Sequence, residues 1–173
     1  MKTDRKTRHL RDVTAEHSVI KARRPFKVVE EEKRRFIRLE IAAPMSLKRI
    51  KGSEGHYRVR SDWHVIHGLI LNMSAGGVLV DLDQALDEGD VVSMRFTLQE
   101  TEQLENVLGL VKRVDIDSEG CLAGIEFVTR EFLADRLSRA EMELLGEEHT
   151  TFNTSVRQVL SRYISRETAA AGA

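Results

Sequence analysis

Short runs of alternating hydrophobic and polar residues make up most of the middle of this chain. From residue 36 to residue 41, apolar side chains alternate with charged ones, which is typical of a half-buried strand. Pro44 is expected to break or bulge this strand before its pattern resumes. Further strand-like runs follow, separated by turns rich in Gly, Asp, Asn and Ser, at 45–50, 63–71, 78–82, 91–98, 107–116 and 122–128. This spacing predicts a mainly β protein, a closed six-stranded antiparallel β-barrel or a sandwich.

The hydrophobic period changes to that of a helix after residue 128. Thr129 is a suitable N-cap, and Gly146 is a natural helix stop. Between them four apolar residues form one predicted stripe: Leu133, Leu137, Ala140 and Leu144. A second helix is predicted by Phe152, Val156, Val159, Leu160, Tyr163 and Ile164. We expect this helix to pack on its own barrel, with a homodimer through it as the alternative, and the tail after Arg166 to fray.

Charge divides the chain into a basic arm and an acidic body. Residues 1–35 carry twelve Lys and Arg against six Asp and Glu, a formal charge of +6, and the remainder is −7. Such a segment, with little periodicity, is predicted to be mobile and to meet an anion. The predicted organisation is therefore a basic N-terminal arm over 1–32, a barrel over 33–129 and a helical extension over 130–173.

Several kinds of site are disfavoured by the residues present. Cys121 is the single cysteine, so an internal disulfide and a Cys-based metal site are excluded, and its apolar surroundings predict a buried thiol. His64 and His67 would face opposite sides of a strand, and no arrangement typical of catalysis is found. We expect no catalytic residue, no metal and no cofactor. The first twenty residues hold no apolar block and no run could span a membrane, so a cytoplasmic protein is expected.

Two short polar sequences are candidates for binding. Arg34 and Arg38 lie four residues apart where the arm meets the first strand, and a turn sequence runs from Asn72 to Gly77. A planar guanidinium can grip a phosphate or the O6/N7 edge of guanine. Asn72 and Ser74 share a face if the backbone is extended. Gly77 would permit a positive φ or a close backbone approach.

In order and spacing, these sequences resemble the two signatures of the PilZ domain family, Arg-x-x-x-Arg and Asp/Asn-x-Ser-x-x-Gly. The segments 88–92 and 123–127 also look like strands of that family, and the resemblance covers residues 33–128. It implies a receptor for the bacterial second messenger cyclic di-GMP that catalyses no reaction. Arg34 and Arg38 would contact phosphate and guanine, and Asn72 and Ser74 would contact guanine. Arg35 would add positive charge, and Gly77 would shape the turn.

The resemblance leaves the mode of action open. We expect the ligand to order the arm and so to regulate a downstream protein partner, and the charge beside Arg34 favours two ligands per chain over one. A ligand-free protein-interaction adaptor of the same fold is one alternative. Nucleic-acid binding through the arm is another, disfavoured because residues 1–25 interleave no aromatic side chains with the basic ones.

Overall fold

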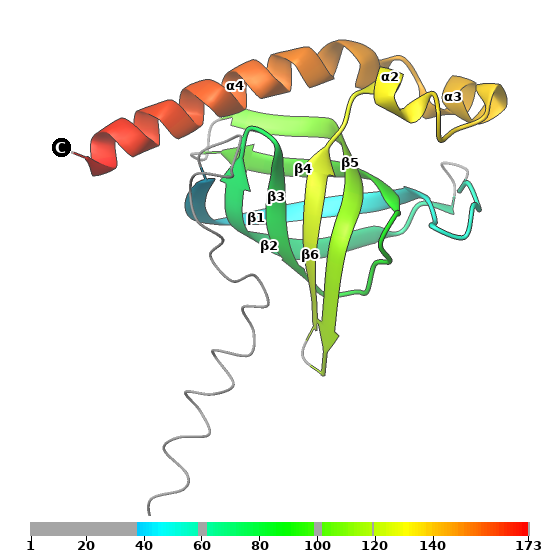
Figure 1. Cartoon of the computed structure of the whole chain (residues 1–173), viewed down its shortest axis with the longest axis horizontal. Helices are drawn as coiled ribbons and strands as arrows, with labels where there is room; N and C mark the ends of the chain where they lie inside the picture. The colour runs from blue at the N-terminus through cyan, green and yellow to red at the C-terminus, as the bar shows by residue number, and fades with distance from the viewer. Residues whose placement is uncertain (1–37, 59–61, 99–101, 119, 173) are drawn as a thin grey trace, which may run out of the picture. The chain divides into compact units, whose positions relative to one another are not determined.

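Six strands close into one antiparallel barrel. A computed structural model describes residues 38–58, 62–98, 102–118 and 120–172, and within them the strands follow the order β1-β2-β3-β6-β5-β4 (Figure 1). Their bounds are β1 Arg38–Lys51, β2 Val65–Ser74, β3 Gly77–Leu82, β4 Val91–Leu98, β5 Glu102–Asp117 and β6 Gly120–Phe127. The mainly β, closed-barrel prediction is confirmed. The predicted arm over 1–32 lies outside the described residues.

Strand β1 runs through Pro44 without a break. Its pairing with β2 shifts register between Glu40 and Ala43, so the predicted irregularity is a bulge just before the proline. Pro44 follows this bulge, and the pairing of β1 with β4 begins only at Met45, so the missing N–H of the proline costs the barrel little. As predicted, Leu39 and Ile41 are half-buried while Arg38 and Glu40 are exposed.

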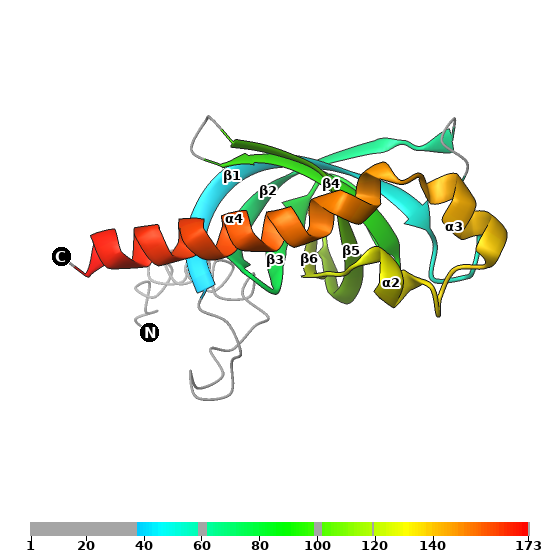
Figure 2. The ribbon, with the colours of Figure 1, turned by 90° about the horizontal axis from the view of Figure 1, so that it is seen from above.

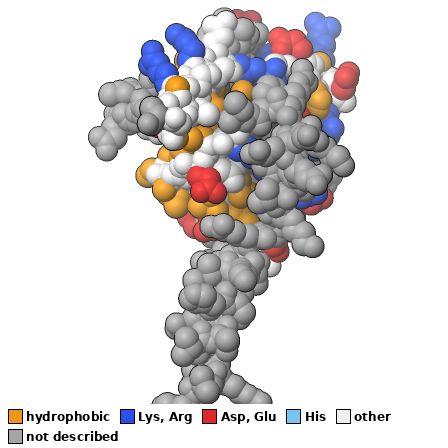
Figure 3. Space-filling model, turned by 60° about the vertical axis from the view of Figure 1, so that its left-hand side comes forward, with side chains coloured by type: hydrophobic (Ala, Val, Ile, Leu, Met, Phe, Trp, Pro, Cys, Tyr) orange, Lys and Arg blue, Asp and Glu red, His pale blue; other side chains and the backbone are white. Residues whose placement is uncertain are grey.

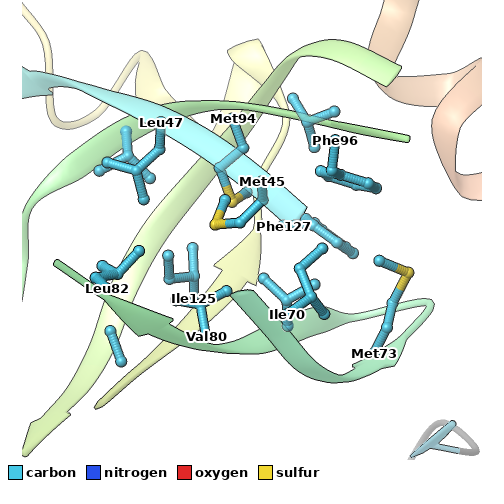
Figure 4. Close-up of a cluster of buried hydrophobic side chains, with 14 of the residues drawn as sticks. Met45, Leu47, Ile70, Met73, Val80, Leu82, Met94, Phe96, Ile125 and Phe127 are labelled. Carbon is cyan, nitrogen blue, oxygen red and sulfur yellow. The ribbon is translucent and has the colours of Figure 1, made fainter. Parts of the chain in front are cut away.

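The barrel interior holds an apolar cluster to which every strand contributes side chains (Figure 4). Ile70 and Val80 are completely buried, and the rings of Phe96 and Phe127 stack with their centroids 6.5 Å apart. Cys121 is buried in this cluster, as predicted. Burial raises the pKa of its thiol above the ordinary value, which keeps the group protonated.

The segment 129–146 forms two short helices instead of the single predicted one. Thr129 caps α2 (Arg130–Leu133) as expected, accepting a hydrogen bond from the Phe132 N–H. The chain then restarts as α3 (Arg139–Leu145), because Ser138 and Glu141 form a capping box. The predicted stripe is therefore wrong in its second half, and Leu144 is 53% exposed.

Helix α4 (Glu148–Ala171) covers part of the barrel and contacts β5, β1 and β2 (Figure 2). Leu160 is fully buried in the barrel cluster, with Val159 and Tyr163 packed against that cluster. The expected packing on its own barrel is thus observed, and a homodimer through α4 stays a prediction. The frayed tail expected after Arg166 is wrong, because α4 stays helical to Ala171. No helix of the described ranges is long and apolar enough to cross a membrane.

Candidate ligand-binding site

The start of β1 and the end of β2 lie side by side at one rim of the barrel. Arg38 is the register partner of Ser74, and Glu40 is the partner of Asn72. Directly opposed residues of an antiparallel pair project from the same face of the sheet. The structure therefore brings together three of the predicted site residues: Arg38, Asn72 and Ser74. Arg34 and Arg35 lie outside the described residues.

This face is the outside of the barrel. Met73, between Asn72 and Ser74, is completely buried in the interior and pairs with Leu39. Side chains alternate along a strand, so Asn72 and Ser74 project outward. The predicted turn over 72–77 is shorter than expected, because β2 continues to Ser74 and only residues 75 and 76 connect it to β3. Extended backbone at Asn72 and Ser74 is what makes them share a face.

The hydroxyl of Ser74 takes part in the turn. Its Oγ accepts a hydrogen bond from the Gly76 N–H at 3.2 Å and donates one to the Gly77 carbonyl at 3.4 Å. A hydroxyl has one donor and two acceptor positions, so one acceptor position remains. Ser74 can therefore stabilise the turn and still accept a hydrogen bond from a ligand.

The backbones of β3 and β6 approach each other so closely at position 77 that only glycine fits there. A Cβ at this position would lie 2.2 Å from the carbonyl oxygen of Ile125 on β6. Its φ does not lie in the left-handed region, so of the two roles expected for Gly77 the structure shows the close approach.

From Asn72 the register continues around the barrel wall over three more strands. Asn72 pairs with Leu79 of β3, Leu79 with Gly124 of β6, and Gly124 with Arg113 of β5. Leu79 and Gly124 are partly exposed, and Arg113 is exposed. The outer surface therefore carries a polar edge on β1 and β2 and, beside it, a floor of small and apolar positions on β3 and β6. Arg113 lies on β5, three strands from β2 in the closed ring.

Charges of both signs border this floor. Glu126 pairs with Gly77 in register, and its carboxylate lies 3.5 Å from the Lys112 ammonium, with about half of each side chain exposed. Glu40 lies beside Arg38 on the other border. The space-filling view of the side where β1 begins shows exposed hydrophobic side chains around an acidic one (Figure 3). A ligand here would meet apolar surface, hydrogen-bonding groups and both kinds of charge.

The sequence did not single out Arg113, Lys112 or Glu126. Arg113 belongs to a run predicted only as a strand, and a bulge between Val111 and Arg113 sets which side it faces. Nothing in the linear sequence reveals that bulge or the four-strand register. Within the described ranges, no group of His, Cys, Asp and Glu is arranged to hold a metal ion.

The fold is a closed six-stranded antiparallel barrel with polar side chains along one outer rim, and its family can be assigned. The family model described as PilZ domain matches residues 32–139, more than half of the chain. The chain therefore belongs to the PilZ domain family.

Solved structures similar to this chain include two kinds of protein. The Bacillus subtilis inhibitor of motility MotI/DgrA is 18% identical to this chain with a TM-score of 0.48. The match covers 83% of this chain and 57% of the MotI/DgrA chain. The PilZ domain of Escherichia coli YcgR with c-di-GMP is 13% identical to this chain with a TM-score of 0.40. The match covers 73% of this chain and 95% of that YcgR domain. YcgR from Escherichia coli in complex with c-di-GMP is 14% identical with a TM-score of 0.43, and the match covers 82% of this chain and 51% of that YcgR chain.

One curated protein also matches, over a shorter region. Protein GrpE 2 of Buchnera aphidicola subsp. Acyrthosiphon pisum (strain APS) is 33% identical over 67 residues, which is 39% of this chain and 35% of that protein. The chain thus spans about a third of this relative and about half of the longer solved structures.

Proposed function

We propose that the protein is a cyclic di-GMP receptor that binds its ligand on the outer face of the barrel and catalyses no reaction. The observation that supports this most is the pairing of Arg38 with Ser74, beside Asn72, on one outward face. In a PilZ family member, these three residues belong to the two sequence signatures of the ligand site. Their strands bring them together although more than thirty residues separate them in the sequence.

Each residue would use a different chemical capacity. The Arg38 guanidinium would donate charge-assisted hydrogen bonds to a phosphate or to the O6/N7 edge of guanine. The Asn72 amide can both donate and accept, which suits the mixed donors and acceptors of a guanine edge. Ser74 would offer its remaining acceptor position, and Leu79 would contact the base plane. Short side chains at Asn72 and Ser74 lose little rotamer freedom on binding.

The regulatory part of the proposal concerns the basic arm. Arg34 and Arg35 lie four and three residues before Arg38 in the sequence, and in the proposed mechanism they join Arg38 around the phosphates. Ligand binding would thereby restrain the arm over 1–32, and the rearranged surface would act on a downstream protein partner. A polyanion with several contacts is needed, because ordering a segment costs about 1–2 kcal/mol per residue for the backbone alone.

Thermal denaturation of the whole chain tests this function. A ligand that binds only the folded state stabilises it by about 2.7 kcal/mol at a free concentration of roughly one hundred times Kd. For a domain of this size that predicts a rise in Tm of about 5–10 °C with cyclic di-GMP. Cyclic di-AMP should produce little change, because adenine lacks the O6 acceptor and N1–H donor of guanine. An unchanged Tm at saturating cyclic di-GMP would instead support the ligand-free adaptor.

A further inference from the structure

We propose that Glu40 of β1 accepts hydrogen bonds from the N1–H and the 2-amino group of a bound guanine, and so makes the site specific for guanine. This inference rests on the proposed function, and it names a residue that lies outside both sequence signatures. Three features of the rim support it: the register of β1 with β2, the hydrogen-bonding pattern of the guanine edge, and the charge that Glu40 places beside Arg38.

The register places Glu40 within reach of the same base as Asn72. The two residues are direct partners across β1 and β2, so Glu40 projects outward as Asn72 does. Directly opposed residues of an antiparallel pair have Cβ atoms about 4.5–5.5 Å apart. Arg38 lies two residues earlier on the same strand, which places it on the same face about 7 Å along β1. All three side chains therefore lie on one outer face, at the ends of two adjacent strands.

The chemistry of Glu40 matches the part of guanine that Arg38 cannot bind. The Watson–Crick edge of guanine presents two neighbouring donors, N1–H and the 2-amino group, next to the O6 acceptor. An ionised carboxylate has two acceptor oxygens and no donor, so Glu40 can bind both donors together. The Asn72 amide opposite it can donate to O6, and Arg38 remains available for N7 or a phosphate. Adenine has no N1–H and no 2-amino group, so the carboxylate would gain neither hydrogen bond from it.

The charge of Glu40 distinguishes this role from that of an ordinary bordering acid. Glu40 is exposed, and no ion pair of its carboxylate is found among the residues that the structure describes. By contrast, the exposed Glu105 carboxylate of β5 lies 3.0 Å from Nε of Arg95. An unpaired negative charge beside Arg38 repels the phosphates of a ligand. Hydrogen bonds from N–H donors on the base offset this repulsion, so the rim favours a guanine nucleotide over an anion that lacks such donors.

Titration calorimetry of the whole chain with cyclic di-GMP tests the assignment through the sign of one effect. The variants are Glu40→Gln and, as a matched control, Glu105→Gln, which removes the same charge from an exposed carboxylate of β5. We expect Glu40→Gln to weaken binding about tenfold to a hundredfold, because the amide has one acceptor oxygen and turns a donor towards the donors of guanine. Glu105→Gln should stay within about twofold of the wild type. Both variants should keep the wild-type Tm, because both carboxylates are exposed.

The opposite sign is expected if Glu40 only borders the site. Glu40→Gln would then remove a repulsive charge and bind cyclic di-GMP as tightly as the wild type, or more tightly. That result would overturn the role of Glu40 while leaving the proposed function intact.

A second ligand, cyclic di-IMP, identifies the atoms in contact because its hypoxanthine bases lack the 2-amino group. The wild type should prefer cyclic di-GMP, and Glu40→Gln should reduce that preference, since the variant has lost the acceptor that the amino group meets. An equal preference in the wild type and in Glu40→Gln would contradict the contact. A wild-type chain that binds neither dinucleotide would overturn both proposals.

Discussion

Replacing Arg38 and Asn72 together by alanine is expected to weaken cyclic di-GMP binding by roughly a hundredfold to a thousandfold. A charge-assisted hydrogen bond contributes about 1.5–3 kcal/mol and a neutral one about 1 kcal/mol. Lost together, they correspond to about two to three orders of magnitude in Kd. The two residues are near neighbours across β1 and β2, so their single effects need not add. The free protein should keep its Tm, because Arg38 is exposed and Asn72 only half-buried.

The matched control for this double variant is Arg95→Ala combined with Glu105→Ala. That pair also joins two neighbouring strands on the barrel surface, and both side chains are about half exposed. Titration calorimetry on both proteins, with Tm measured in parallel, gives the comparison. Comparable affinities for the two double variants would remove Arg38 and Asn72 from the site.

Replacing Asp90 by alanine is expected to lower the free energy of unfolding by about 3–5 kcal/mol, because it leaves a partly buried arginine without its counter-charge. Asp90 is completely buried immediately before β4, and its Oδ2 lies 2.9 Å from Nε of Arg49. Its carboxylate also accepts hydrogen bonds from the N–H groups of Ser53 at 2.8 Å and Asp87 at 3.0 Å. The Asp90 side chain therefore joins Arg49 of β1 to two turns, the one at Ser53 that follows β1 and the one at Asp87 that precedes β4.

Urea denaturation of Asp90→Ala, beside Glu105→Ala, measures this effect. The Arg95–Glu105 pair is exposed, and removing such a pair changes stability by only about 0–1 kcal/mol. If the free energy of unfolding of Asp90→Ala is within about 1 kcal/mol of the wild-type value, the buried carboxylate is not a significant stabilising group.

The alternation of apolar and polar residues was sufficient to predict the strands, and it left a closed barrel and a sandwich as the two alternatives. It succeeded because a barrel needs one buried face on each strand, and the period of two appears directly in the sequence. The run predicted over 91–98 coincides with β4. The turn before β3 was predicted too long, since Asn72 and Ser74 favour turns by composition. Barrel pairing with β1 and β3 overrides that preference and keeps both residues extended.

The helical region shows where periodicity is a weaker guide. Leu133 and Leu137 are buried as predicted, but Leu144 is exposed and Leu145 takes the buried position. The predicted stripe fails because helix α2 ends at Leu133 and a new helix, α3, begins after its N-cap Ser138. The Ser138–Glu141 capping box was a readable signal for this second helix start.

The candidate site was only partly predictable for a related reason. Asn72 and Ser74 are close in sequence, so their shared face follows from extended backbone alone. The residues of β3 that lie beside Asn72 depend on a register shift in β2–β3, which changes which residues oppose one another. Such bulges reflect packing of the whole barrel, and a local pattern does not encode them.

The most direct test of the central claim is a calorimetric titration of the whole wild-type chain with cyclic di-GMP at physiological salt, set beside Arg38→Ala. We predict saturable binding by the wild type, with two ligands per chain, and an affinity about tenfold to a hundredfold lower for Arg38→Ala. Absence of binding heat from the wild type, or equal affinity in the variant, would contradict a cyclic di-GMP site formed by Arg38, Asn72 and Ser74.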